Sequence, residues 1–226
     1  MFLQNNFWLN FIATIFEPQN KTMTDYIQLQ LEREAHAIKN IPIENGFEKA
    51  IDIIYKAVHT NSKKLVASGM GKAGQIAHNI ATTFSSTGTP AVFLHPSEAQ
   101  HGDMGVVQPG DVLFLVSNSG KTRELVELVE LCNRLHGKLS LIVLSGNPKS
   151  ELALLADASL NTGNPDEICP LGLTPTTSTT TMTVIGDIMV TLMMNKIDFT
   201  AEDYAKRHHG GYLGTKSRAV SQKDSN

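Results

Sequence analysis

Polar side chains that could hold a phosphate group are concentrated in the turn SNSGKT at residues 117–122. They are Ser117, Asn118, Ser119 and Thr122. The turn follows an apolar run and precedes a helical pattern, where free backbone N–H groups and the helix dipole favour an anion. An ordinary helix cap needs only one such side chain, so the surplus favours phosphate binding. The turn is not a nucleotide-binding P-loop, because Leu115 stands where a glycine is required five residues before Gly120.

A second glycine-rich turn, GMGKAG at 69–74, fits the dinucleotide-binding pattern G-x-G-x-x-G and also follows an apolar run. A nicotinamide site additionally needs an acidic residue at the end of the next strand, to bind the ribose hydroxyls. That strand ends at His95, and Glu98 comes only later, in a loop. The pattern leaves open a phosphate-type turn with Lys72 as its cation, a nicotinamide site, and a tight strand–helix connection without a ligand.

Two loops concentrate titratable side chains. HPSEAQHGDMG at 95–105 contains two histidines and two carboxylates, and RHHGGYLG at 207–214 contains adjacent histidines. The first spacing matches no standard zinc pattern and no thiolate assists, so acid–base or substrate contact is favoured over metal binding. Glu167 precedes the hydroxyl-rich helix start TPTTSTT, although composition alone would make it a surface carboxylate.

The elements that must position these residues alternate along the chain. Short apolar runs predict strands at 63–68, 90–94, 111–117, 139–144 and 157–160. Apolar spacing predicts helices at 24–39, 46–59, 73–87, 122–136, 149–155, 176–195 and 200–206. Continuous apolar strands belong to parallel sheets. The pattern therefore predicts an α/β fold, a doubly wound αβα sandwich with a central five-stranded parallel sheet. Both glycine-rich turns lie at the carboxyl ends of strands, where such sheets bind ligands.

Composition restricts the classes of function. The chain has 226 residues, 41% of them hydrophobic, and a formal net charge of −3, which makes nucleic acid an unexpected partner. Its two cysteines, Cys132 and Cys169, lie far apart. This argues against a disulfide scaffold or zinc ribbon and agrees with a reducing cytoplasm.

The N-terminal extension, residues 1–22, begins with the apolar stretch MFLQNNFWLNFIATIF. This stretch lacks a basic n-region and is followed by no cleavage site, and it is too short and too interrupted by Asn to span a bilayer. We expect a disordered extension here and no membrane association, with either Met1 or Met23 as the true start. Thr24 or Asp25 is expected to cap the first helix. The domain is predicted at 23–214, followed by a polar tail at 215–226.

Five segments together resemble the sugar isomerase (SIS) domain of D-arabinose 5-phosphate isomerases in order and spacing. They are SGMGKAG, STGTPAVFLHPSEAQHGDMG, SNSGKTREL, CPLGLTPTTSTTTMTVIGD and FTAEDYAKRHHGGYLG, within residues 24–214. The resemblance implies reversible conversion of D-ribulose 5-phosphate to D-arabinose 5-phosphate, which feeds synthesis of the acid sugar Kdo for lipopolysaccharide or capsule. It also implies a cytoplasmic homotetramer.

The resemblance carries the family's catalytic set to Lys72, Glu124, Glu167 and His208. Aldose–ketose isomerisation moves a proton between C1 and C2 through an enediol, which needs a base and oxygen-polarising groups but no redox cofactor and no obligatory metal. We hypothesise that Glu167 is the base, provided that it is shielded enough to raise its basicity, with Glu124 in reserve. Lys72 would stabilise the enediolate. His208, reaching a neighbouring subunit's site, or His101 would assist ring opening.

The remaining candidates are substrate contacts. The phosphate ligands are predicted to be Ser117, Asn118, Ser119 and Thr122, and further contacts are predicted from Ser68, Gly71, His95, Glu98, Thr177 and Ser178. No metal ligand is assigned. Histidines that converge on the site would nevertheless trap inhibitory zinc at His101.

The sequence departs from the family pattern at three points. Many members carry two CBS modules after the SIS domain, and this sequence stops where they would begin, so we expect a single-domain form. Residues 208–211 read His-His-Gly-Gly where the family usually has His-Pro-Gly-Gly, and we assign the family position to His208. Lys121 replaces the glutamate of the usual Ser-Gly-Glu and adds a cation beside the phosphate turn.

Two other functions remain open. The first is isomerisation of another phosphosugar, such as a hexulose or heptose phosphate, because the residues that set chain length are not identifiable. The second is a non-catalytic sugar-phosphate sensor. Such regulators need a DNA-binding domain, and residues 1–60 offer two helices without a basic recognition face.

Overall fold

A five-stranded, all-parallel sheet forms the centre of the protein, in a computed structural model that describes residues 22–44, 46–210, 212 and 216. Its strands are β1 (Leu65–Gly69), β2 (Ala91–Phe93), β3 (Val112–Val116), β4 (Ser140–Ser145) and β5 (Ala158–Asn161). Every residue of β1 and β3 is buried, as continuous apolar runs predict. The predicted extension and tail lie outside the described residues, apart from Thr22 and Lys216.

The strand order β2-β1-β3-β4-β5 confirms the doubly wound topology. The chain runs from β1 outward to β2, then returns past β1 to β3 and continues outward to β5. The direction of winding reverses between β1 and β3. This is the switch point at which such sheets open a crevice beyond their carboxyl ends.

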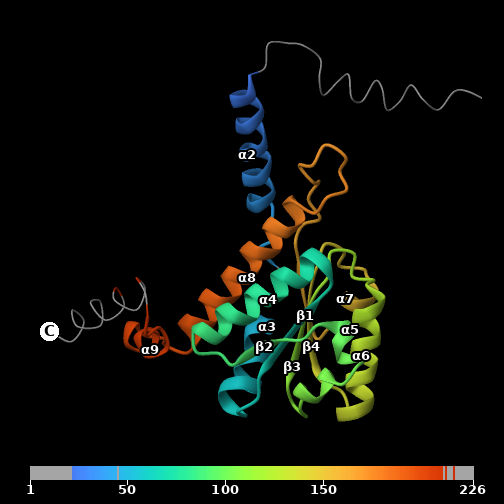
Figure 1. Ribbon diagram of the computed structural model, residues 1–226, viewed down its shortest axis with the longest axis vertical. Coiled ribbons are helices and arrows are strands. Elements are labelled where there is room, and N and C mark those ends of the chain that lie inside the picture. The colour runs from blue at the N-terminus through green and yellow to red at the C-terminus, as the bar shows by residue number, and fades with distance from the viewer. Residues whose placement is uncertain (1–21, 45, 211, 213–215, 217–226) are drawn as a thin grey trace, which may run out of the picture.

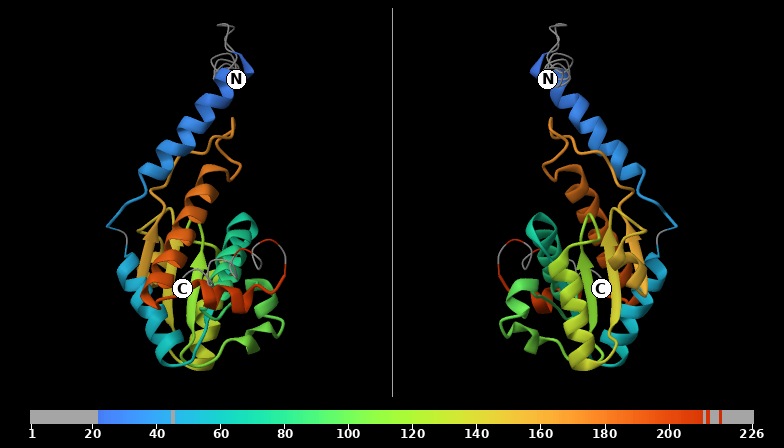
Figure 2. Two further views of the ribbon diagram at one scale, coloured as in Figure 1. Left: turned by 90° about the vertical axis from the view of Figure 1, so that its left-hand side faces the viewer. Right: turned by 90° about the vertical axis from the view of Figure 1, so that its right-hand side faces the viewer.

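Helices cover both faces of the sheet (Figures 1 and 2). One apolar core joins the sheet to α3 (Phe47–Ile54), its π-helical continuation (Tyr55–Thr60), α4 (Gly71–Ser86) and α8 (Thr177–Lys196). A second core, on the opposite face, joins the sheet to α5 (Pro96–Ala99), α6 (Arg123–His136) and α7 (Glu151–Leu155). A short helix, α9 (Ala201–Arg207), follows α8. The predicted αβα sandwich is confirmed.

Helix α2 (Met23–Lys39) projects away from the sheet beside the start of α8 (Figure 1). Thr22 is its cap rather than Thr24 or Asp25, because Asp25 serves as the third helical residue of a capping box with Thr22. The apolar residues that predicted this helix face solvent in the single chain, with Ile27 51% and Leu31 59% exposed. Their spacing identified a helix correctly, but the residues that the structure describes leave its apolar face exposed.

The predicted loop at 95–105 contains two short helical elements. Pro96 starts α5, where its fixed φ suits the first helical position, and Asp103–Val106 form a 3₁₀ turn. Segments of four residues are too short for hydrophobic periodicity to reveal them.

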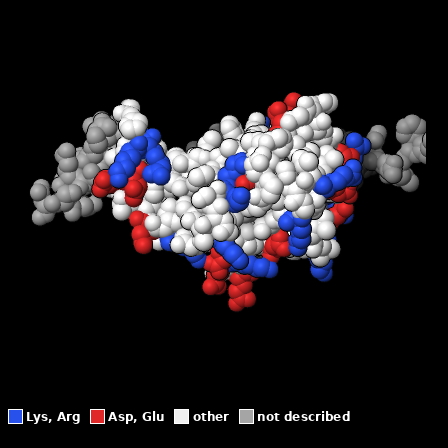
Figure 3. Space-filling view, turned by 90° about the horizontal axis from the view of Figure 1, so that it is seen from below, with Lys and Arg blue, Asp and Glu red and all other residues white. Residues whose placement is uncertain are grey.

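Positive and negative side chains are mixed on one face of the protein, seen from below in Figure 3. On the face seen in Figure 3, Lys and Arg are interspersed with Asp and Glu, unlike the single-sign surface that nucleic acid attracts. No helix in the described part of the chain is long and apolar enough to cross a bilayer.

Candidate active site

A cavity of about 780 Å³ opens where the turns after β1, β3 and β4 meet the start of α8. This is the carboxyl end of the sheet, where the switch point predicts a ligand site. The cavity is lined by Met70, Lys72, Ala73, Ser117, Asn118, Ser119, Lys121, Thr122, Gly146, Asn147, Pro148, Asn164, Pro175, Ser178, Thr179 and Met182. The structure thus brings together Lys72, the predicted phosphate turn and Ser178.

The turn after β3, residues 117–122, is called the β3 turn. The hydroxyl groups of its Ser117 and Thr122 form hydrogen bonds within the turn and do not cap helix α6. Ser117 Oγ lies 2.8 Å from Thr122 Oγ1 and accepts a hydrogen bond from the Gly120 amide at 3.1 Å. Thr122 is the residue before α6, yet its side chain makes no capping hydrogen bond. The first amides of α6 therefore lack a side-chain acceptor from their cap residue, as an anion-binding helix start requires.

The β3 turn is fixed in place by α7. Gly120 has φ +62°, and a Cβ built there would lie 1.9 Å from Ser150 Oγ. The Leu152 amide also donates to the Gly120 carbonyl oxygen at 3.1 Å. Ser150 is the N-cap of α7, so this helix start leaves room at position 120 for glycine alone.

The β1 turn packs differently and presents Lys72. A Cβ at Gly74 would lie 2.5 Å from the Gly69 carbonyl oxygen, so these glycines allow α4 to approach β1 closely. Gly71 has φ +57° and no neighbouring atom within 4 Å of a Cβ. Lys72 is exposed, and no described carboxylate lies within ion-pair distance of its Nζ.

The charge on the cavity wall has one sign among the described residues. Two lysines, Lys72 and Lys121, line it, and no aspartate or glutamate does. Together with the hydroxyl-rich turn, this wall suits an anionic ligand. A dinucleotide site would instead present a carboxylate to the ribose, and Glu98 lies exposed on α5 outside the wall.

Glu167 does not line the cavity, but one of its oxygens caps the start of α8, where Ser178 is part of the wall. Its Oε2 accepts hydrogen bonds from the Thr176 amide at 2.7 Å, the Thr176 hydroxyl at 2.9 Å and the Ser178 amide at 3.2 Å. Burial acts to raise the Glu167 pKa, but the hydrogen bonds from Ser178 and Thr176 outweigh it and hold the pKa below its usual value. The expectation that shielding raises its basicity is therefore wrong. Its role as base stays a prediction.

Several predicted site residues are not among those that line the cavity, and besides Glu98 and Glu167 they include Gly71, Ser68, Thr177 and Glu124. Ser68 is buried and donates to the Leu94 carbonyl oxygen at 2.6 Å, which ties β1 to the end of β2. Thr177 is buried and donates to a carboxylate of α2. Glu124 occupies the first turn of α6, where its charge complements the helix dipole. Their roles in catalysis or binding stay predictions.

The histidines of the two predicted loops, all of which the structure describes, are not among the residues that line the cavity of their own chain. His95 is half-buried, with Nδ1 inaccessible and without a hydrogen-bond partner, and His101 is exposed beyond α5. His208 ends α9 and stacks on Tyr204 at 3.7 Å. Figure 1 shows α9 at the far end of α8, whose first turn includes Ser178 and Thr179, which line the cavity. A contribution from His208 would therefore have to come from a second copy of the chain.

Sequence reasoning missed the part of the wall that follows β4 and β5. Asn147 and Asn164 both line the cavity, and Asn164 has φ +50°. A Cβ at Gly146 would lie 2.6 Å from Asn118 Oδ1 and 3.2 Å from Asn164 Oδ1, so two amide side chains converge over this glycine. The tripeptide Gly-Asn-Pro occurs at 146–148 and again at 163–165, and this repetition was the available signal.

The described residues contain no group of three or more His, Cys, Asp or Glu side chains that could hold a metal ion. In the part of the chain that the structure describes, His101 therefore does not belong to a set of three side chains that could bind the predicted zinc ion. It remains untested.

Comparison with known proteins gives consistent similarities. The family model of the SIS domain matches residues 60–192. The arabinose 5-phosphate isomerase KdsD of Yersinia pestis is 44% identical over 188 residues, which are 83% of this chain and 56% of that relative. The chain therefore spans only a little more than half the length of the curated relatives it matches.

Two solved structures extend the similarity to the fold. A Bacteroides fragilis protein, named as a phosphosugar isomerase involved in capsule formation, is 59% identical with a TM-score of 0.83, covering 84% of this chain and 100% of that one. An Escherichia coli CFT073 protein solved in complex with arabinose 5-phosphate is 34% identical with a TM-score of 0.72. That match covers 83% of this chain and 100% of the other.

Proposed function

This chain belongs to the SIS domain family, and from that membership we propose that it interconverts D-arabinose 5-phosphate and D-ribulose 5-phosphate. The cavity wall carries the proposal: a hydroxyl-rich turn and two lysines line it, and no described carboxylate does. Such a wall favours a dianionic sugar phosphate. The similarity to KdsD enzymes and to a protein solved with arabinose 5-phosphate supports this choice of sugar.

The β3 turn would hold the phosphate and leave the sugar's C1 and C2 toward Lys72. The first amides of α6 and the hydroxyls of Ser117 and Thr122 supply donors for the phosphate oxygens. Lys72 has no described carboxylate partner, so its charge is available for the enediolate oxygen. Neither step requires a redox cofactor or a metal.

Glu167 is our proposed proton carrier between C1 and C2. The amide and hydroxyl of Thr176 and the amide of Ser178 all donate to Oε2, which holds this oxygen on the start of α8 and leaves Oε1 as the oxygen proposed to face the substrate. A carboxylate anchored in this way is ionised at neutral pH and presents one oxygen to a proton. Its lowered pKa makes it a weaker base, so the proposal depends more on orientation than on basicity.

The proposed assembly is a homotetramer, in which His208 completes a neighbour's site. Two features support it. His208 follows α9, which lies at the far end of α8 from the residues that line the cavity, and α2 exposes an apolar face that includes Ile27 and Leu31. We propose that the enzyme acts in the cytoplasm and supplies Kdo synthesis for lipopolysaccharide or capsule. The capsule role of the Bacteroides fragilis relative supports that setting.

The assay that tests the function starts from D-arabinose 5-phosphate in EDTA without added cofactor and follows ribulose 5-phosphate. Rapid conversion with little activity on six- and seven-carbon phosphates is expected. Conversion of a hexulose or heptose phosphate instead would favour the other isomerase function. Tight binding without turnover would favour the sensor. An absence of both binding and turnover would refute the proposed substrate.

Added micromolar zinc should slow the reaction, and an unchanged rate would refute the zinc proposal.

Glu167→Gln tests the assignment of the base. We expect the variant to bind D-arabinose 5-phosphate within a few-fold of the wild type and to lose turnover, because an amide cannot accept the carbon-bound proton. Glu124→Gln is the matched comparison. Loss of turnover in Glu124→Gln with near-normal turnover in Glu167→Gln would transfer the role to Glu124.

A further inference from the structure

Helix α2 contributes little to the core but touches the segment that carries Glu167. Ala37 is its only described buried residue, and the helix projects beyond the sheet (Figure 1). Two consecutive polar residues, Arg33 and Glu34, nevertheless make hydrogen bonds to residues more than 130 positions away in the sequence. These tertiary hydrogen bonds connect α2 to the segment that contains Glu167 and to the start of α8.

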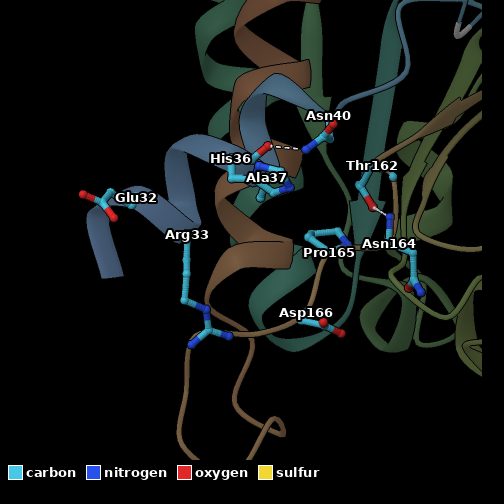
Figure 4. A pocket seen from close by; sticks show the side chains of 10 residues that line it. Glu32, Arg33, His36, Ala37, Asn40, Thr162, Asn164, Pro165 and Asp166 are labelled. Atoms are coloured by element: carbon cyan, nitrogen blue, oxygen red, sulfur yellow. Dashed lines mark hydrogen bonds between the residues drawn. The ribbon is translucent and has the colours of Figure 1, made fainter. Parts of the chain in front are cut away.

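Arg33 holds the backbone of the proposed base. Its Nη2 donates to the Glu167 carbonyl oxygen at 3.0 Å. Figure 4 shows the side chain extending from α2 beside a cavity of about 570 Å³, toward the loop that continues from Asp166. The Arg33 guanidinium thus connects α2 to the backbone of Glu167, the proposed base.

Glu34 holds the next residue through a hydroxyl. Its Oε1 accepts from Thr177 Oγ1 at 2.9 Å, and the same Thr177 oxygen accepts from the Ile168 amide at 3.1 Å. Glu34, Thr177 and Ile168 therefore form a continuous chain of hydrogen bonds. Its last link is the amide directly after Glu167.

The other oxygen of Glu34 shows that stability alone does not account for this contact. Oε2 is buried and has no hydrogen-bond partner in the described structure. A buried acceptor without a partner lowers the free energy of unfolding. A contact kept at that cost is more readily understood if it orients something.

We propose that Arg33 and Glu34 are positioning residues, which aim Oε1 of Glu167 at the substrate by fixing the backbone of residues 167 and 168. The inference rests on the proposed function of Glu167. The start of α8 fixes Oε2 and α2 fixes the main chain, so the direction of Oε1 follows from both. Helix α2 thereby belongs to the active centre although none of its side chains touches the cavity wall.

The test compares Arg33→Ala, Glu34→Ala and Glu34→Gln in the full chain. Glu32→Ala is the control, because Glu32 is exposed one position away and bonds only the Gln28 side chain. We expect kcat to fall between about 10- and 100-fold in the two alanine variants at Arg33 and Glu34, with KM within about twofold. Glu34→Gln keeps an oxygen acceptor for Thr177 and should restore most of kcat.

Further readouts separate this inference from the proposed function. If the wild type isomerises the sugar but Arg33→Ala and Glu34→Ala match the control in kcat, the positioning role is overturned and the function stands. A fall in kcat that Glu34→Gln does not reverse, with a matching loss of thermal stability, would also overturn it. Hydrogen exchange at the Ile168 amide needs no turnover. It should accelerate in Glu34→Ala and not in the control. Unchanged exchange would show that Glu34 does not hold the Ile168 amide through Thr177, which would overturn its positioning role.

Discussion

The turn after β1 and the turn after β3 each place a glycine in left-handed backbone directly before a lysine, with φ +57° at Gly71 and +62° at Gly120. Their surroundings differ. A Cβ at Gly71 would meet open space, whereas one at Gly120 would overlap Ser150. The β3 turn is thus held by a neighbouring helix start, and the β1 turn presents Lys72 at an open edge of the cavity.

We infer from this difference that the two turns have different roles in one site: the β3 turn holds the phosphate, and the β1 turn supplies the lysine for the reacting oxygen. A fixed turn with preset hydroxyls suits a phosphate group that does not change during the reaction. An open lysine suits an oxygen whose charge changes as the enediolate forms. Both turns contain the dipeptide Gly-Lys, so the neighbouring elements rather than the dipeptide determine whether a turn is held rigidly.

Replacing Lys72 and Lys121 in turn is the strongest test of these different roles, because it has the largest expected effect. We expect Lys72→Gln to lower kcat/KM by about 10³-fold, or about 4 kcal/mol, because a charge aimed at the enediolate is lost. Lys121→Gln should mainly raise KM, by no more than about tenfold, since Lys121 stands beside the phosphate turn. Steady-state kinetics of both variants measure the contrast. Equal losses in kcat would remove the distinction between the two lysines.

Gly120→Ala should destabilise the fold by about 3 kcal/mol. Left-handed φ costs an alanine about 1 kcal/mol, and the overlap with Ser150 adds about 2 kcal/mol of strain. Urea unfolding measures the change as a shift in midpoint at constant slope. A variant as stable as the wild type would show that α7 does not fix the turn.

Ser117→Ala tests the phosphate side with a smaller expected effect. Ser117 Oγ bonds Thr122 and the Gly120 amide, so its loss should raise KM about tenfold, or about 1.4 kcal/mol, with kcat nearly unchanged. Ser85→Ala, which removes a hydroxyl bonded to the Ala91 carbonyl oxygen on another part of the fold, is the control. A fall in kcat at constant KM would contradict phosphate binding by this turn.

Gly71→Ala is the counterpart of Gly120→Ala and should cost only about 1 kcal/mol. Its φ is left-handed, but no heavy atom would lie within 4 Å of the added Cβ. The same urea experiment provides the comparison. A loss as large as that of Gly120→Ala would mean that the β1 turn is as tightly held as the β3 turn.

Much of the fold followed from local pattern. Continuous apolar runs predicted the five parallel strands, and apolar spacing predicted the helices between them. The predictions were wrong where an element is very short or where a boundary depends on a residue several positions away. Helix α5 has four residues, and Thr22 rather than Thr24 or Asp25 caps α2, because a capping box depends on a residue three positions away.

The sequence by itself determined which chemistry the site contains. The surplus of hydroxyls in SNSGKT, the lysine in GMGKAG and the order of five family-like segments all lie in contiguous residues. Turn chemistry and strand burial depend mainly on neighbours a few positions away, which a single sequence displays.

Only the tertiary structure decided which of these residues meet. Glu167 caps α8 with a lowered rather than a raised pKa, because it folds back on Thr176 and Ser178. Arg33 bonds Glu167 across 134 positions of sequence, and His208 is not among the residues that line the cavity of its own chain. Such contacts arise from how helices and sheet pack into layers, a property of the whole chain that no local pattern encodes.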